Sequence, residues 1–311
     1  MSIRFGGAGA DSLLGTAEQD LLAGRGGADS LDGLAGQDAV FGGNGNDSVF
    51  GGAGDDLVSG GAGDDYVVGD AARGGPFPVE VNGTPGRNLL FGGSGRDSVR
   101  GGYGEDTAFG GSGNDTIIGW GFGPPSPSGA EGYEALDDGD LLYGGAGRDS
   151  IRGGGGADTI AGGTGDDTLQ GGYDNDRLTG GGGADLFLFN RENIVGTTLD
   201  SGVGPGNRDV VTDFRSADQD VLDLSGYRSG FMPSDTPPPI FIGMEAFRVT
   251  PEDGFRIQVR YEVQGDRTIL QVYTQFNLPP PDFEPQPSPG VSLEIELLGV
   301  QGLTADDVFL G

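Results

Sequence analysis

The chain has 311 residues, of which 67 are glycine and 48 are acidic, against 17 basic residues that are all arginine. The formal net charge of −31 makes nucleic acid and anionic membranes poor partners, and it opposes compaction unless cations neutralise it. The sequence contains neither histidine nor cysteine, which excludes disulfides, a thiol nucleophile, a two-His zinc motif and any triad that uses histidine. No apolar run is long enough to span a membrane.

A nine-residue repeat begins at Gly6 and continues, with two breaks, to residue 188. The stretch Gly42–Phe50 is a clean copy, with the sequence GGNGNDSVF. When position 1 is the first glycine, position 8 is apolar in all seventeen units and position 6 is aspartate in sixteen, with Asn88 as the exception. The aspartates at position 6 are Asp11, Asp20, Asp29, Asp38, Asp47, Asp56, Asp65, Asp97, Asp106, Asp115, Asp140, Asp149, Asp158, Asp167, Asp176 and Asp185.

Each position of the repeat has a physical purpose. Glycines allow positive φ angles and let backbone carbonyls approach a cation closely. Aspartate and carbonyl oxygens are the hard ligands that calcium accepts, so the sixteen aspartates are predicted metal ligands. The last three residues of a unit predict a short strand whose central side chain points inward, and only stacked units can bury it. A disordered acidic linker is the alternative, but such a linker does not keep aspartate and an apolar residue in phase over seventeen units.

These units resemble the RTX family of secreted bacterial proteins. The resemblance implies an all-β fold, a right-handed parallel β-roll in which two units form one coil and calcium lies between turns of units n and n+2. Seventeen stacked units would offer at most about 15 such sites, and about 15 calcium ions would nearly neutralise the charge of −31. Three units depart from the pattern, so their sites are in doubt: the unit at Gly15 lacks two glycines, and the others have Asn88 at position 6 and Ala135 at position 1.

The chain is expected to divide into a short lead (residues 1–5), the β-roll (6–188) and a C-terminal region (189–311). Gly- and Pro-rich inserts at 69–82 and 119–134 read as surface loops, either for binding or as tolerated insertions. Past Asp185, alternating patterns predict strands, and the region resembles the segment that closes the β-roll in RTX proteases. These strands are expected at residues 186–189, 209–214, 220–225, 255–263, 267–276 and 292–300, with a Pro-rich loop at 277–291.

Residues 303–311 resemble the uncleaved C-terminal signal for type I secretion, and they also read as a last strand. No apolar segment at the N-terminus predicts a cleavable signal peptide. The sequence therefore predicts a secreted, extracellular calcium-binding protein that folds after export and has a structural, surface-layer, matrix or adhesive role. Its expected partners are calcium ions, the type I secretion machinery, and either a second copy or a component of the cell surface or matrix.

Two other functions are considered. The chain could be the non-catalytic calcium-folding and secretion module of an RTX exoenzyme, either a hydrolase or a polysaccharide-modifying enzyme. It could also be a polysaccharide-active enzyme that uses a carboxylate pair, but adjacent acids such as Asp137 and Asp138 are expected by chance among 48. Repeats that start at Gly6 favour the first function over the module if the chain is complete. No catalytic residue is assigned.

The two faces of the roll are expected to differ. Even-numbered units place apolar residues at the outward positions 7 and 9, among them Leu57, Leu89, Phe91 and Tyr143. Odd-numbered units place mostly serine or threonine at position 7. An apolar row of this size is seldom left in water. The bulky residues of the inserts, or else a second subunit or a surface partner, are expected to cover the row; those insert residues are Phe77, Trp120 and Phe122.

Overall fold

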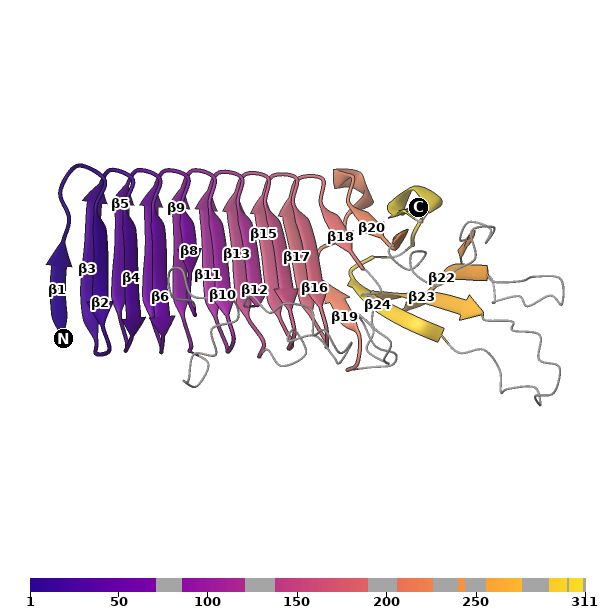
Figure 1. Ribbon diagram of the computed structural model, residues 1–311. Helices are drawn as coiled ribbons and strands as arrows, with labels where there is room; N and C mark the ends of the chain where they lie inside the picture. Colours follow the sequence, from indigo (N-terminus) through magenta and orange to yellow (C-terminus); the bar gives the residue numbers. More distant parts are fainter. Residues whose placement is uncertain are drawn as a thin grey trace.

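The computed structural model describes residues 1–70, 86–120, 138–189, 206–225, 240–243, 256–275, 291–300 and 302–309. Within these ranges the chain winds back and forth between two long sheets, and its coils stack along the molecule (Figure 1). The first sheet contains, in spatial order, β1 (Ser2–Phe5), β3 (Asp20–Gly26), β5 (Ala39–Asn44), β7 (Leu57–Ala62), β9 (Leu89–Ser94), β11 (Thr107–Ser112), β13 (Leu141–Ala146), β15 (Thr159–Thr164), β17 (Arg177–Gly182), β19 (Asp209–Val211), β24 (Val291–Leu298), β23 (Arg267–Gln275), β22 (Arg256–Gln264) and β21 (Ile240–Gly243). The second sheet contains β2 (Ser12–Thr16), β4 (Ser30–Ala35), β6 (Ser48–Ala53), β8 (Tyr66–Val68), β10 (Ser98–Gly102), β12 (Thr116–Trp120), β14 (Ser150–Gly154), β16 (Thr168–Gly172), β18 (Leu186–Leu188), β20 (Val221–Asp223) and β25 (Val308–Phe309).

The core is a double column of position-8 side chains, one column from each sheet. Neighbouring strands are parallel and in register, so Val40 pairs with Val58 and Val49 pairs with Val67. These side chains are fully buried between the sheets. Burying one of them contributes about 1.5–3 kcal/mol, which no unit could gain alone because it lacks a neighbour to cover it. The predicted all-β parallel β-roll is confirmed.

The two inserts do not change the register of the repeat, and each insert begins two residues later than predicted. Strand β7 pairs with β9 and β11 pairs with β13 without a shift in register. Gly69 and Gly119 belong to the roll, because a Cβ on either would lie under 3.0 Å from the position-6 side chain of the following unit, Asn88 or Asp140. They are therefore the position-1 glycines of those two units, and the extra residues enter between positions 2 and 4. Ala135, predicted to be an irregular position 1, lies outside the described residues.

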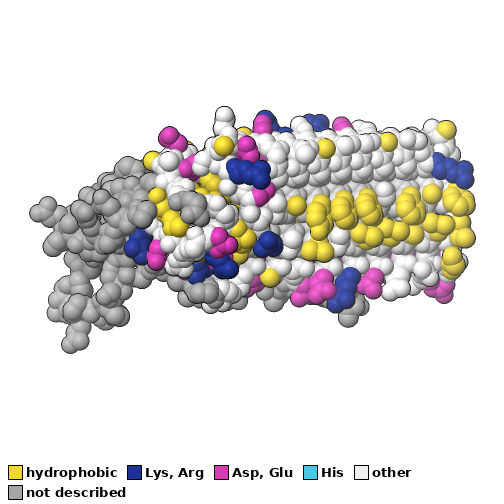
Figure 2. Space-filling view, turned by 180° about the vertical axis from the view of Figure 1, so that it is seen from behind, with side chains coloured by type: hydrophobic (Ala, Val, Ile, Leu, Met, Phe, Trp, Pro, Cys, Tyr) yellow, Lys and Arg dark blue, Asp and Glu magenta, His cyan; other side chains and the backbone are white. Residues whose placement is uncertain are grey.

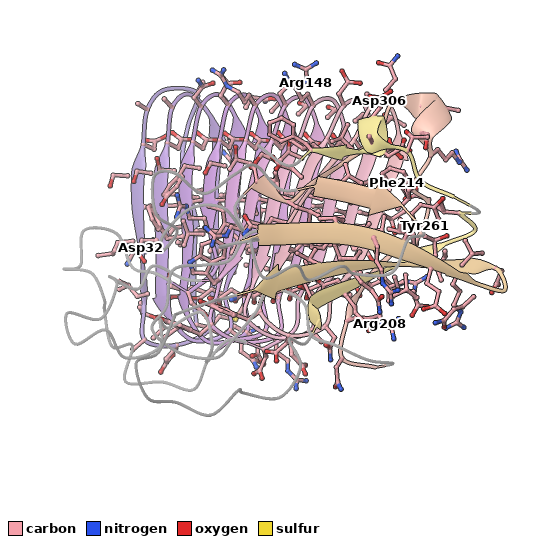
Figure 3. The ribbon with its side chains drawn as sticks, turned by 90° about the vertical axis from the view of Figure 1, so that its right-hand side faces the viewer. Asp32, Arg148, Arg208, Phe214, Tyr261 and Asp306 are labelled. Atoms are coloured by element: carbon pink, nitrogen blue, oxygen red, sulfur yellow. The ribbon has the colours of Figure 1, made fainter. Side chains whose placement is uncertain are left out.

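The C-terminal strands close one end of the roll. Strand β24 adds to β19 in parallel, β23 and β22 form the predicted antiparallel hairpin, and β25 joins β20 as a last strand. Phe214 and Tyr261 pack against the core where these strands meet the roll (Figure 3). Arg208 forms a buried ion pair with Glu294 at 3.3 Å, which ties the chain before β19 to β24.

Two further features bear on the predicted organisation. Residues 2–5 of the predicted lead form β1, which pairs with β3 and extends the first sheet. The predicted loop at 277–291 falls outside the described residues except for Val291, which opens β24. Within the described part of the chain, no helix is long and apolar enough to cross a membrane.

One face of the roll carries the expected apolar row (Figure 2). On the first sheet, Leu89 and Leu141 remain 38% and 41% exposed. The position-9 rings of Phe91, Phe109 and Tyr143 stack on one another with centroids 5.2 and 4.9 Å apart, so these rings shield each other's faces.

The prediction that Trp120 covers this apolar row is wrong. Trp120 ends β12 in the second sheet, where its ring lies 4.3 Å from the Arg152 guanidinium. The reason is that Trp120 occupies position 2 of a unit and is held in the turn by the register of the roll. Phe77 and Phe122 lie outside the described residues.

Candidate calcium sites in the turns

The predicted ligands form two columns, one along each edge of the roll. All sixteen aspartates lie at the turns between strands, and fifteen of them are 1–3% exposed, whereas Asp11 is partly exposed. In each column, Oδ1 of one aspartate accepts a hydrogen bond from the backbone N–H of the aspartate two units earlier. The N–H of Asp29 donates to Asp47 at 2.7 Å, and the N–H of Asp149 donates to Asp167 at 2.8 Å. From Asp29 onward, this ladder orients the carboxylates in the same way.

The second carboxylate oxygen, Oδ2, is buried and has no hydrogen-bond partner in most of these aspartates. Eleven residues share this feature: Asp29, Asp38, Asp47, Asp56, Asp65, Asp97, Asp115, Asp140, Asp149, Asp167 and Asp176. Asp106, Asp158 and Asp185 direct Oδ2 to the same place, beside the position-1 glycine of their own unit. Burying an unpaired anionic oxygen is costly, so a column of them indicates cations at these points.

The first two aspartates of the chain are different. Oδ2 of Asp11 accepts a hydrogen bond from Gly7 N–H at 2.6 Å, and Oδ2 of Asp20 accepts from both the N–H and the hydroxyl of Thr16 at 2.6 and 2.8 Å. The departure of Asp20 follows from Thr16, which stands at position 2 of its unit where most units have glycine. Oδ2 of Asp11 and of Asp20 still lies beside the position-1 glycine of its own unit, as in the other units, but it accepts hydrogen bonds within that unit.

The position-1 glycine keeps several oxygens accessible at one point. A Cβ on Gly42 would lie 2.6 Å from the carbonyl oxygen of Gly60, in unit n+2, and under 3.0 Å from Oδ2 of Asp47. Gly162 has the same relation to Gly180 and Asp167. At position 2, Gly43 has a φ of 118°, a conformation that favours glycine. A carboxylate of one unit and a carbonyl of the next coil are oxygen donors of the kind calcium accepts, at about 2.3–2.6 Å.

Burial raises the pKa of several of these carboxyl groups. It raises the pKa of Asp56 to about 8 and that of Asp97 and Asp167 to about 7, and neighbouring acids in each column add to the effect. Within the described residues, no three acidic side chains converge on one point. Each turn thus supplies at most two carboxylates, and backbone carbonyls must complete the shell, which suits calcium because it takes six to eight oxygens.

Sequence reasoning missed two members of the columns. The N–H of Asp176 donates to Oδ1 of Asp209 at 2.9 Å, and the N–H of Asp185 donates to Oδ1 of Asp220 at 3.0 Å. Both residues precede two apolar residues, as in positions 6–8 of a unit, but the Gly-Gly-x-Gly spacing that marks a unit is missing before them. Sequence reasoning also missed Asp213, whose carboxylate accepts hydrogen bonds from the N–H groups of Gly180 and Gly181 in the last turn.

Comparisons with known proteins identify the repeat. A family model of the RTX calcium-binding nonapeptide repeat matches residues 5–40, 41–73, 82–117, 134–169 and 161–193, which is more than half of the chain. The chain is also similar to the solution structures of the AlgE6R3 and AlgE6R2 subunits of the mannuronan C5-epimerase from Azotobacter vinelandii. Identities are 29% and 30%, the matches cover 55% of this chain and 78% and 87% of those chains, and both TM-scores are 0.32.

No curated protein matches the chain. The repeats of the matched family bind calcium ions and are typical of extracellular proteins. Because the family model covers more than half of the sequence, the chain belongs to the family of RTX calcium-binding nonapeptide repeat proteins.

Proposed function

We propose that this chain is a folding switch that is unfolded where calcium is scarce and forms its β-roll where calcium is plentiful. The observation that carries the proposal is the column of aligned, buried Oδ2 atoms without hydrogen-bond partners. Without calcium these anions repel one another along each edge, and a core of one side chain per unit cannot offset the entropy of the chain. With calcium, each turn gains a cation that links two coils.

The proposed ligands are Oδ2 of the position-6 aspartate of unit n and the position-1 carbonyl of unit n+2. Aspartates from Asp29 to Asp185 fit this role, whereas Asp11 and Asp20 have hydrogen bonds to Oδ2 already and contribute less. Sites with dissociation constants of roughly 10⁻⁴–10⁻³ M, as in extracellular modules, would remain empty inside a cell and fill outside it.

The proposed role is that of a secreted, non-catalytic protein of the surface layer or matrix, or an adhesin. Export would use the type I machinery and the C-terminal residues 303–311. The family supports an extracellular location, and Asp306 of that segment lies at the surface, whereas Asp307 is buried. The exposed apolar row on the first sheet supports contact with a second copy or a surface component.

Circular dichroism and light scattering during a calcium titration test this function. We expect a disordered spectrum in chelator and β structure at millimolar calcium. Magnesium at the same concentration should not replace calcium, because it demands a smaller octahedral shell and keeps its water. A fully folded protein in chelator would refute the proposal.

A further inference from the structure

Asn88 is the one position-6 residue of the seventeen units that is not aspartate. It is 3% exposed and keeps its place in the ladder: its N–H donates to Asp106 at 2.8 Å, and its Oδ1 accepts from the N–H of Asp56 at 3.0 Å. Because a backbone N–H can only donate, the amide oxygen must face Asp56. The amide nitrogen, Nδ2, therefore lies where the other units place Oδ2.

Asp70 receives this nitrogen. Nδ2 of Asn88 donates to Oδ1 of Asp70 at 3.1 Å, and the N–H of Tyr103 donates to Oδ2 of Asp70 at 3.0 Å. The backbone of Gly86 also donates to this carboxylate. Three N–H groups from three points of the chain thus surround one anion. An amide N–H cannot bind a cation, so the turn of this unit does not present the donor set of the other turns.

We propose that Asn88 and Asp70 form a calcium-independent latch, a hydrogen-bonded pair that replaces the ion in this unit. The inference rests on the proposed function of the other turns as calcium sites. Asp70 immediately precedes the first insert, and Gly86 and Asn88 follow it, so the latch joins the two ends of the insert without an ion. It also divides the calcium column of this edge into one part before Asn88 and another that begins at Asp106.

The second insert provides a matched contrast within the same chain. It enters a unit at the same place, and that unit begins at Gly119 and has Asp140 at position 6. Oδ2 of Asp140 is buried without a hydrogen-bond partner, as in an ordinary turn. Position 2 is Trp120, which contacts Arg152 and offers no carboxylate to an amide. The base of this second insert is therefore closed by an ion.

Counting bound calcium by native mass spectrometry tests the latch in the full chain. At saturating calcium, Asn88→Asp should bind one ion more than the wild type, and Asp140→Asn one ion fewer. Asp70→Ala should leave the count unchanged, because Asp70 is not a ligand, but should raise the calcium midpoint of folding several-fold, because the latch is lost.

Two results would overturn the latch: an unchanged count in Asn88→Asp, or the loss of an ion in Asp70→Ala. The Asp70→Ala and Asp140→Asn variants decide the matter even if Asn88→Asp does not fold. A wild type that binds no calcium would instead refute the proposed function, so the two failures are distinguishable.

Discussion

Asp167→Asn should stabilise the β-roll when calcium is scarce and destabilise it when calcium is plentiful. Asparagine keeps the oxygen that accepts the N–H of Asp149 and replaces the buried, unpartnered Oδ2 with a neutral amide group. Burial, with smaller contributions from Asp149 and Asp185, raises the pKa of Asp167 from 3.8 to about 7. About 3 pKa units correspond to about 4 kcal/mol of lost stability at a pH above 7, and screening by water at the edge of the roll reduces this to about 2 kcal/mol.

The new amide N–H group costs part of that gain, so the variant should be about 1 kcal/mol more stable at low calcium. The balance changes as calcium rises. Each ion bound on folding adds about 1.4 kcal/mol for each tenfold increase in free calcium, and the variant binds one ion fewer. Its advantage should therefore vanish within about one decade of calcium concentration above the dissociation constant of the site, and then reverse.

Urea unfolding followed by circular dichroism measures this dependence. Free calcium should range from about 0.1 to about 100 mM, which brackets the affinities of extracellular calcium modules. Asp166→Asn is the matched control, because Asp166 is the preceding residue but pairs with Arg148 at 2.8 Å at the surface, and its slope against calcium should equal that of the wild type. Parallel lines for Asp167→Asn and the wild type would refute the reasoning.

Three other outcomes follow from the same geometry. In chelator, lowering the pH from about 8 to about 5 should increase β structure by circular dichroism. Burial raises the pKa of Asp56 to about 8 and that of Asp97 to about 7, so the folded state loses stability as the pH rises from 3.8 through those values. A pH-independent spectrum would contradict this. Asp47→Ala should raise the calcium midpoint of folding more than Asp11→Ala, since Oδ2 of Asp11 already accepts a hydrogen bond, and equal shifts would speak against the column of sites. Deleting residues 303–311 should abolish export in a secretion assay while the repeats still bind calcium. The loss of buried Leu303 and Val308 should lower the free energy of unfolding by about 2 kcal/mol each. Undiminished secretion would argue against a secretion signal in these residues.

The repeat made most of the roll predictable. A nine-residue phase assigns Val49 to the core and Asp47 to the turn, and parallel stacking then places Asp47 beside Asp29 and Asp65 without further information. The same logic predicted that the two outer faces differ. These successes share one cause: each unit sees only its neighbours, so a local pattern determines the contacts.

The remaining features depend on contacts that the repeat pattern does not encode. The two residues Gly69 and Gly119 were assigned to inserts because the chain departs from the pattern directly after each of their units begins. Asp209 and Asp220 occupy position 6 without the preceding Gly-Gly-x-Gly spacing, and strand pairing reveals their place. The partnership of Asn88 with Asp70 crosses an insert, so the spacing between the two residues carried no signal.

Gly42→Ala isolates the contribution of a position-1 glycine to one calcium site. Its φ lies outside the left-handed region, so alanine is allowed by the backbone and only the methyl group matters. That methyl would lie 2.6 Å from the Gly60 carbonyl oxygen, which cannot yield cheaply because it belongs to the backbone of the next coil. Overpacking should cost about 1–3 kcal/mol, and one ion should be lost.

Gly182→Ala is the control for this substitution, because its Cβ would meet nothing within 4 Å. Its φ also lies outside the left-handed region, so it should be neutral or up to about 1 kcal/mol stabilising, through the lower entropy of the unfolded chain. Urea unfolding at saturating calcium and an ion count by native mass spectrometry compare the two variants. If Gly42→Ala kept every ion and matched Gly182→Ala in stability, the oxygens around Gly42 would not form a calcium site, because a methyl group and an ion cannot occupy the same point.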